Sequence, residues 1–275
     1  MAWTAYELRS YSSHVPKEWI DDRKRCEEAG IPKTVEFQTK PQMALEMIQE
    51  ATIAGVPYKW VTGDCVYGDY TEIRMWLEQN NKCYVMSVSG KAYVWRGYKQ
   101  ISVGSILKSL PEQGWFEART DWRELHVNYI HIRYTCGNGS KGERLYDWLT
   151  LPINPGTTEG FERCLLIRRS KSSPDELRAY ICFAPVNTPS QKLVEVAGTR
   201  WTIETAFKES KGEVGLDQYE VRSYDGWYRH ITFACIALAF LTVLSCLSFD
   251  AKTFQKYNPK SSSLEAFKKG RNLPV

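Results

Sequence analysis

The N-terminal third of the chain alternates between apolar patterns of helical and of strand spacing. Apolar residues recur with helical spacing at residues 22–30 and 41–54, so we expect a helix in each stretch. A short β-prone run follows from Tyr58 to Thr62, then a helical pattern from Asp69 to Asn80 and a second strand pattern from Lys82 to Val88. This strand–helix–strand order predicts two parallel strands joined by a right-handed crossover.

The pattern changes between about residues 90 and 190. Short runs that alternate or are wholly apolar are separated there by Gly, Pro and Ser turns, and we expect strands at Tyr93–Trp95, Arg144–Leu149, Arg163–Arg168 and Arg178–Phe183. Helical patterns then resume at about 189–196, 199–211 and 224–249. The pattern predicts an α/β protein with a β-rich region in its middle.

Residues 231–249 contain no charged side chain and are long enough to span a bilayer. A helix that is apolar on all sides is either a membrane span or the fully buried helix of a large α/β domain. Thr232, Thr242, Ser245 and Ser248 dilute its apolar character, and the sequence holds no second span. We therefore expect a buried helix packed against the sheet, with a single membrane span as the alternative.

Composition narrows the class of protein. With 43% hydrophobic and 13% aromatic residues, the chain of 275 residues is typical of an ordered globular protein. Its net charge of +4 is carried by residues 250–275, a basic tail that suits either backbone contact with nucleic acid or a solvated chain end. The eight cysteines are placed singly, and the N-terminus has no apolar signal segment, so we expect free thiols and a cytoplasmic protein.

Two positions carry candidate chemistry. Asp64 follows the first predicted strand directly, and open α/β sheets place their active groups at such strand ends. Arg200, Glu204 and Lys211 share one face of the helix predicted between Thr199 and Gly212. On spacing alone, Asp64 is typical of a capping residue, and the helix face is typical of exposed i,i+4 charge pairs.

Longer motifs change that balance. The segment from Arg200 reads R-x3-E-x6-K and continues as KGEVGLDQYEVRS and GWYRHI. Upstream, in order, stand VPKEWIDDRKRCEEAGIP, FQTKPQMA, WVTGDCVYGD, GSKGERLYDW and VAGTRWTIETAFKESKG. Together they resemble bacterial insertion-sequence transposases of the DDE superfamily, in the branch marked by Y, R, E and K motifs.

The resemblance implies an RNase H-like core that cleaves and rejoins DNA with Mg²⁺ or Mn²⁺. Asp64 and Glu204 would be catalytic metal ligands, because these ions prefer carboxylate oxygens. Arg200 and Lys211 would contact phosphates of the insertion-sequence ends, with a nucleoid-associated location and a homodimer on the DNA. The family's tyrosine falls at Ala197, which receives no role.

The resemblance also implies a domain organisation. Residues 1–89 would form part of the catalytic core, 90–190 a β-rich insertion, 191–249 the C-terminal helices of the core and 250–275 the basic tail. Asp64 and Glu204 would then converge, with Cα atoms within roughly 12 Å in two-metal geometry.

The family's first catalytic Asp precedes the EWIDDRKRCEEAGIP block, which here begins near the start of the sequence. Asp21 and Asp22 stand at a predicted helix start, where acids cap free N–H groups, and do not replace it. We therefore expect an N-terminally truncated transposase that does not cut DNA alone. The alternative is a catalytically dead DNA-binding remnant.

Overall fold

The computed structural model describes residues 15–110, 130–139, 142–171, 173–220 and 222–257. Its helices are α1 Lys17–Asp21, α2 Arg23–Glu28, α3 Lys40–Ile53, α4 Cys65–Gly68, α5 Thr71–Gln79, α6 Val103–Ser109, α7 Ser190–Thr199, α8 Trp201–Val214 and α9 Tyr224–Tyr257. Its strands are β1 Trp60–Gly63, β2 Cys83–Val88, β3 Tyr93–Arg96, β4 Lys99–Ser102, β5 Ile130–Gly139, β6 Gly142–Pro152, β7 Phe161–Ser170 and β8 Leu177–Pro185.

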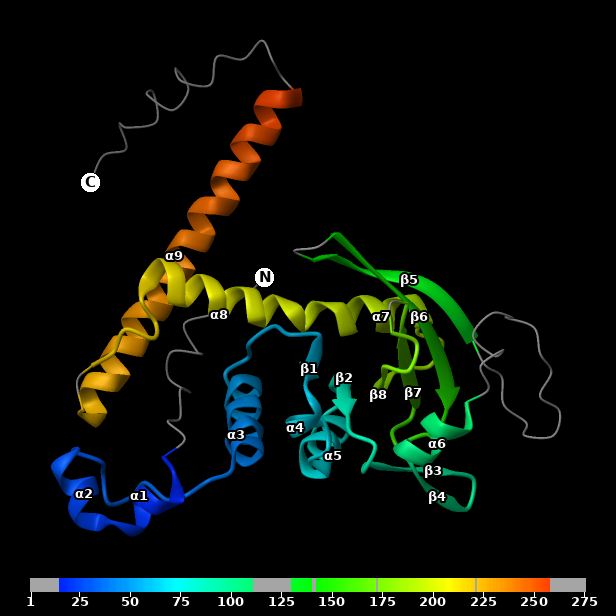
Figure 1. Cartoon of the computed structure of the whole chain (residues 1–275), viewed down its shortest axis with the longest axis horizontal. Helices are drawn as coiled ribbons and strands as arrows, with labels where there is room; N and C mark the ends of the chain where they lie inside the picture. The colour runs from blue at the N-terminus through cyan, green and yellow to red at the C-terminus, as the bar shows by residue number, and fades with distance from the viewer. Residues whose placement is uncertain (1–14, 111–129, 140–141, 172, 221, 258–275) are drawn as a thin grey trace.

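A mixed sheet organises the molecule, with strand order β1-β2-β8-β7-β6-β5 (Figure 1). The predicted parallel pairing of β1 with β2 is confirmed, with Gly63 opposite Met86. The remaining pairs are antiparallel, beginning with β2 and β8. This mixed α/β architecture is consistent with an RNase H-like fold.

The strands of the predicted insertion, residues 90–190, divide between two sheets. Four of the six strands of the main sheet come from residues 130–185, and β8 pairs directly with β2. Within the part of the chain that the structure describes, the β3–β4 hairpin forms a second, two-stranded sheet. The β-rich region therefore continues the sheet begun by β1 and β2.

Side chains alternate across the sheet and build a core on each face. Tyr84 and Met86 of β2 join a cluster with Ile73 and Leu77 of α5, whereas Val85 points to the opposite face. On that opposite face the apolar side of α7 packs against β2, β6, β7 and β8. Helices α5 and α7 thus cover opposite faces of the sheet.

The predicted helix 199–211 forms, but both of its predicted ends are wrong. Thr199 does not cap it, because its hydroxyl donates to the Val196 carbonyl within the preceding helix α7. Gly212 lies inside α8, and the helix ends at Gly215, whose φ of +66° suits glycine. In Figure 1, α7 and α8 follow one another across the sheet and beyond its β1 edge.

The prediction that residues 231–249 form a buried helix against the sheet is wrong. They belong to α9, which packs on α8 near Ile231 and Ala234 and then projects from the body (Figure 1). Phe233, Phe240 and Leu247 are 69%, 62% and 60% exposed. By length and composition alone, Tyr224–Leu247 could also cross a membrane.

Candidate active site

Asp64 stands where the polypeptide leaves β1 and enters α4. Its carboxylate accepts a hydrogen bond from the Val66 backbone N–H at 2.9 Å, so Asp64 is the N-cap of α4. Burial and, secondarily, the negative charge of Asp64 raise the pKa of Tyr67. The raised pKa favours the neutral form of the Tyr67 hydroxyl, which can donate a hydrogen bond.

Gly68 and Asp69 attach α4 to the end of β2. A Cβ on Gly68 would lie 1.9 Å from the Ser87 carbonyl oxygen, so only glycine permits this approach. Gly68 is thus required for close packing of α4 on β2. Tyr70 is the N-cap of α5, and the Asp69 carboxylate accepts a hydrogen bond from the Ser89 N–H at 2.8 Å.

Glu204 lies in the first turn of α8 and forms an ion pair with Arg200 at 3.2 Å. The two side chains are 48% and 26% exposed, so the pair is an open one that contributes roughly 0–1 kcal/mol to stability. A metal ion or a phosphate could displace such a partner at little cost. The shared face predicted for Arg200 and Glu204 is confirmed.

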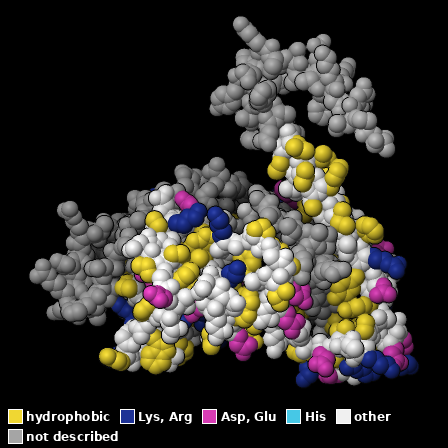
Figure 2. Space-filling model, turned by 180° about the vertical axis from the view of Figure 1, so that it is seen from behind, with side chains coloured by type: hydrophobic (Ala, Val, Ile, Leu, Met, Phe, Trp, Pro, Cys, Tyr) yellow, Lys and Arg dark blue, Asp and Glu magenta, His cyan; other side chains and the backbone are white. Residues whose placement is uncertain are grey.

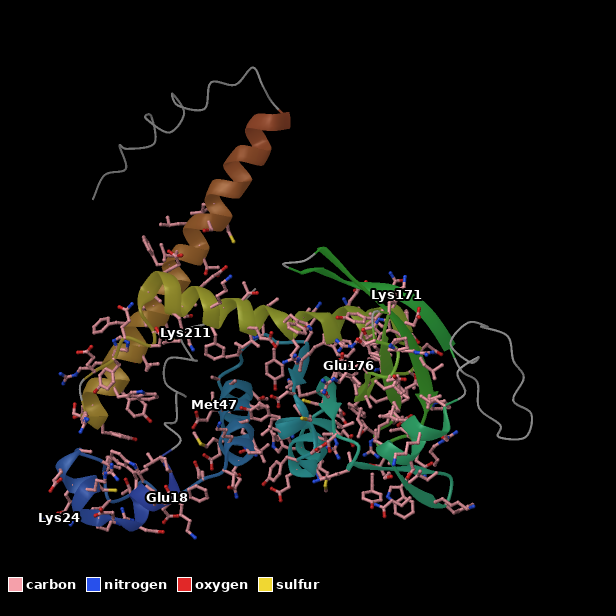
Figure 3. The ribbon with its side chains drawn as sticks, viewed as in Figure 1. Glu18, Lys24, Met47, Lys171, Glu176 and Lys211 are labelled. Carbon is pink, nitrogen blue, oxygen red and sulfur yellow. The ribbon has the colours of Figure 1, made fainter. Side chains whose placement is uncertain are left out.

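Lys211 is an exposed residue in the last turn of the same helix, near the contact between α8 and α9 (Figure 3). The side of α8 that faces the rest of the protein is only partly buried. Ser210 is buried, whereas Phe207 is exposed. The helix packs chiefly on α9 and leaves its charged side open to solvent.

Asp64 and Glu204 are not joined by any hydrogen bond or ion pair in the part of the chain that the structure describes. Across the same residues, His, Cys, Asp and Glu form no group of three or more that could hold a metal ion. The convergence of Asp64 and Glu204 stays a prediction. Both supply oxygen donors that suit Mg²⁺ or Mn²⁺, and Glu204 would first have to release Arg200.

Sequence reasoning missed a buried polar cluster formed by α5, β2 and β7. Glu78 accepts a hydrogen bond from the Tyr84 hydroxyl at 2.6 Å and two from the Arg163 guanidinium, whose Nε lies 2.8 Å from Oε1. Glu78 directly follows the buried Leu77 on α5, and this acid beside an apolar position was the available signal. The cluster borders a pocket between α5 and the β3–β4 hairpin.

A comparison with known proteins bears on the region around Asp64. Residues 8–107 match a protein-family model described as DDE superfamily endonuclease. The matched stretch includes β1, Asp64 and β2 and ends within α6, so it does not reach Glu204. No curated protein matches the chain. The match supports a transposase or endonuclease family of the DDE type.

Proposed function

We propose that this chain is the DNA-processing part of an insertion-sequence transposase of the DDE type. The family match over residues 8–107, with Asp64 at the carboxyl end of a parallel strand inside it, carries the proposal. The R-x3-E-x6-K pattern of α8 supports it from outside the matched stretch.

The acids would bind metal ions, and the basic side chains would contact the DNA. Asp64 and Glu204 would hold divalent cations, which when bound supply activation of the attacking oxygen and stabilisation of the leaving oxygen. Asp64 is preoriented by its bond to the Val66 N–H, and Tyr67 offers a neutral hydroxyl beside it. Arg200 would exchange its contact with Glu204 for a phosphate of the DNA, as a planar fork, and Lys211 would act as a point charge.

Only two acids are assigned, and phosphoryl transfer of this kind depends on the positioning of two cations. The proposal therefore includes the expectation that this chain alone binds DNA but does not cleave it. The role of residues 90–190 as a β-rich insertion, a homodimer on DNA and a nucleoid-associated location belong to the same proposal.

The salt dependence of DNA binding tests the phosphate contacts. A labelled duplex that carries the DNA flanking the coding sequence is titrated at several salt concentrations with wild type and with the Arg200→Ala/Lys211→Ala variant. The logarithmic slope should fall by about 0.9 for each lost phosphate contact. An exposed lysine on another helix, Lys24→Ala of α2, is the matched control. An unchanged slope for the double variant would remove α8 from the DNA interface.

A further inference from the structure

A pocket of about 390 Å³ lies between α5 and the β3–β4 hairpin, on the face of the sheet that α5 covers. This volume is within the range of roughly 300–1,000 Å³ that small-ligand sites occupy. The side chains that give it its chemistry are the cations Arg74 and Lys91, the rings Tyr93 and Trp95, and the amides Gln100 and Asn154.

Tyr93 and Trp95 present two aromatic rings on one side of β3. They are two residues apart in a strand, so they share a face, while Val94 between them is buried. Tyr93 is 59% exposed and Trp95 is 51% exposed. Two large rings left open to solvent beside a pocket are available for stacking with a planar ligand.

The hairpin that carries these rings is fixed to the main sheet. The Asn154 side chain donates to the Gly97 carbonyl at 2.8 Å and accepts from the Gly97 N–H at 2.7 Å. The Asn154 backbone N–H donates to the Trp95 carbonyl at 2.8 Å. Because Asn154 holds the backbone of Trp95 and Gly97 in place, the hairpin would lose little conformational freedom when a ligand binds.

The pocket lining carries three cations, Arg74, Lys91 and Arg163, against two acids, Asp69 and Glu78, which leaves a net charge of +1 that favours an anionic ligand. Arg163 is committed to Glu78, and Asp69 accepts from the Ser89 N–H. Arg74 donates to the Gly68 carbonyl and to the Thr71 hydroxyl, and among the described residues no carboxylate forms an ion pair with it. Arg74 and Lys91 therefore remain as the cations able to meet a phosphate.

The Asp69 side of the pocket lies toward the carboxyl ends of β1 and β2, where Asp64 also lies. Gly63 pairs with Met86 in the parallel pair, so the residues that follow β1 and β2 leave the sheet at the same end of the strands. Asp69 lines the pocket, and its bond to Ser89 ties the end of α4 to the end of β2. A DNA strand that reaches Asp64 would pass close to the pocket.

We propose that this pocket and its two rings bind an unpaired segment of a DNA strand, with bases stacked on Tyr93 and Trp95 and phosphates beside Arg74 and Lys91. Stacked rings next to cations are the chemistry by which proteins hold single strands, because every base offers a flat face. The inference rests on the proposed function only for the choice of DNA as the nucleic acid.

The test measures fluorescence anisotropy of a labelled oligothymidylate of about 12 nucleotides, a length within the usual site size for single strands. The buffer contains EDTA, so neither metal binding nor cleavage contributes. Trp95→Ala should weaken binding about tenfold, and Trp95→Phe should weaken it less because a ring remains. Tyr98→Ala is the matched control: Tyr98 is fully exposed on the same hairpin but does not line the pocket.

Three results would overturn the proposal: no binding by the wild-type chain, equal losses in the Trp95→Ala and Tyr98→Ala variants, or tighter binding of a duplex of the same length. Tighter binding of an oligouridylate would overturn the assignment to DNA. Near-ultraviolet circular dichroism of each variant verifies that the fold is retained. If Asp64 and Glu204 prove not to act on DNA, this measurement still stands, because it involves neither residue and no metal.

Discussion

Glu78 is a buried carboxylate whose charge is balanced inside the protein. The Arg163 guanidinium and the Tyr84 hydroxyl both donate to it, and the bond to Glu78 raises the pKa of Arg163. The cluster joins α5 to β2 and β7, elements far apart in the sequence. Its main effect is to fix how these elements meet, since a buried ion pair adds little net stability.

Removal of one partner of this pair should destabilise the fold strongly. Arg163→Ala leaves the Glu78 charge buried without compensation, which costs about 3–5 kcal/mol of unfolding free energy. Urea denaturation measures the loss. Adding Glu78→Gln to Arg163→Ala should restore part of it, because the uncompensated charge is gone. A double variant less stable than Arg163→Ala would contradict this explanation.

Alkaline pH should weaken the same cluster through Tyr84. Burial and, next, the charge of Glu78 raise the pKa of Tyr84 well above its ordinary value of 10.0. The folded state therefore favours the neutral phenol: this contribution is fully present below about pH 10 and is lost as pH rises toward the folded pKa. Urea midpoints on both sides of about pH 10 should fall less steeply for Tyr84→Phe than for wild type. Equal slopes would refute this role.

Gly68 and Gly212 are both helical glycines in different surroundings. A Cβ on Gly68 would meet the Ser87 carbonyl oxygen, whereas one on Gly212 meets nothing within 4 Å. Gly68→Ala should therefore lower the unfolding free energy by about 1–3 kcal/mol through overpacking. Gly212→Ala should raise it by up to ~1 kcal/mol, because alanine is the better helix former. Urea midpoints that move in the same direction for both variants would contradict the close packing of α4 on β2.

At the scale of elements, local sequence patterns predicted the order of helices and strands. They did not predict where the helices end or what surrounds them. The β1–α5–β2 order follows from short apolar runs, and Asp64 follows from its place just after one of them. The end of α8 at Gly215 was missed because Gly212 came first in the sequence, and only the positive φ at Gly215 distinguishes them. The surroundings of α9 could not be predicted, since an apolar helix reads the same whether it is buried or exposed.

Residues 236–247, in the projecting part of α9, include six exposed apolar side chains: Ile236, Phe240, Leu241, Val243, Leu244 and Leu247. Seen from behind, apolar side chains cover it (Figure 2). Exposed apolar surface of this extent drives association with other proteins or with membranes. The helix begins against the body of the protein, where the Tyr224 N–H donates to the Ala29 carbonyl at 2.8 Å.

Polar substitutions on the projecting part should reduce that association. Phe240→Ser/Leu244→Ser should increase the fraction of monomer in detergent-free buffer, because both side chains are exposed and their loss leaves the core intact. Light scattering coupled to size exclusion measures the mass. Ile231→Ser, at a buried position of the same helix, is the control that should instead lower stability. A mass distribution unchanged by the double substitution would show that α9 does not cause association.

At the scale of the whole molecule, β1 forms one edge of the main sheet and α8 extends beyond that edge (Figure 1). An edge strand offers unpaired backbone groups to another strand. The two assigned acids belong to different parts of the chain: Asp64 follows β1, while Glu204 follows a helix that covers the opposite face from α5. The sequence could name both residues through a motif, but their approach depends on packing between elements 140 positions apart, which no local pattern encodes.

The most direct test of the proposed site is Mn²⁺ binding to the protein–DNA complex, followed by electron paramagnetic resonance. If Asp64 and Glu204 share a metal site, Asp64→Asn and Glu204→Gln should each weaken Mn²⁺ binding roughly 10- to 100-fold or more, since loss of even a supporting group costs that much. Glu209→Gln, an exposed acid on the same helix, should leave it unchanged. Mn²⁺ affinity unaffected by Glu204→Gln, or lowered equally by Glu209→Gln, would contradict a shared metal site at Asp64 and Glu204.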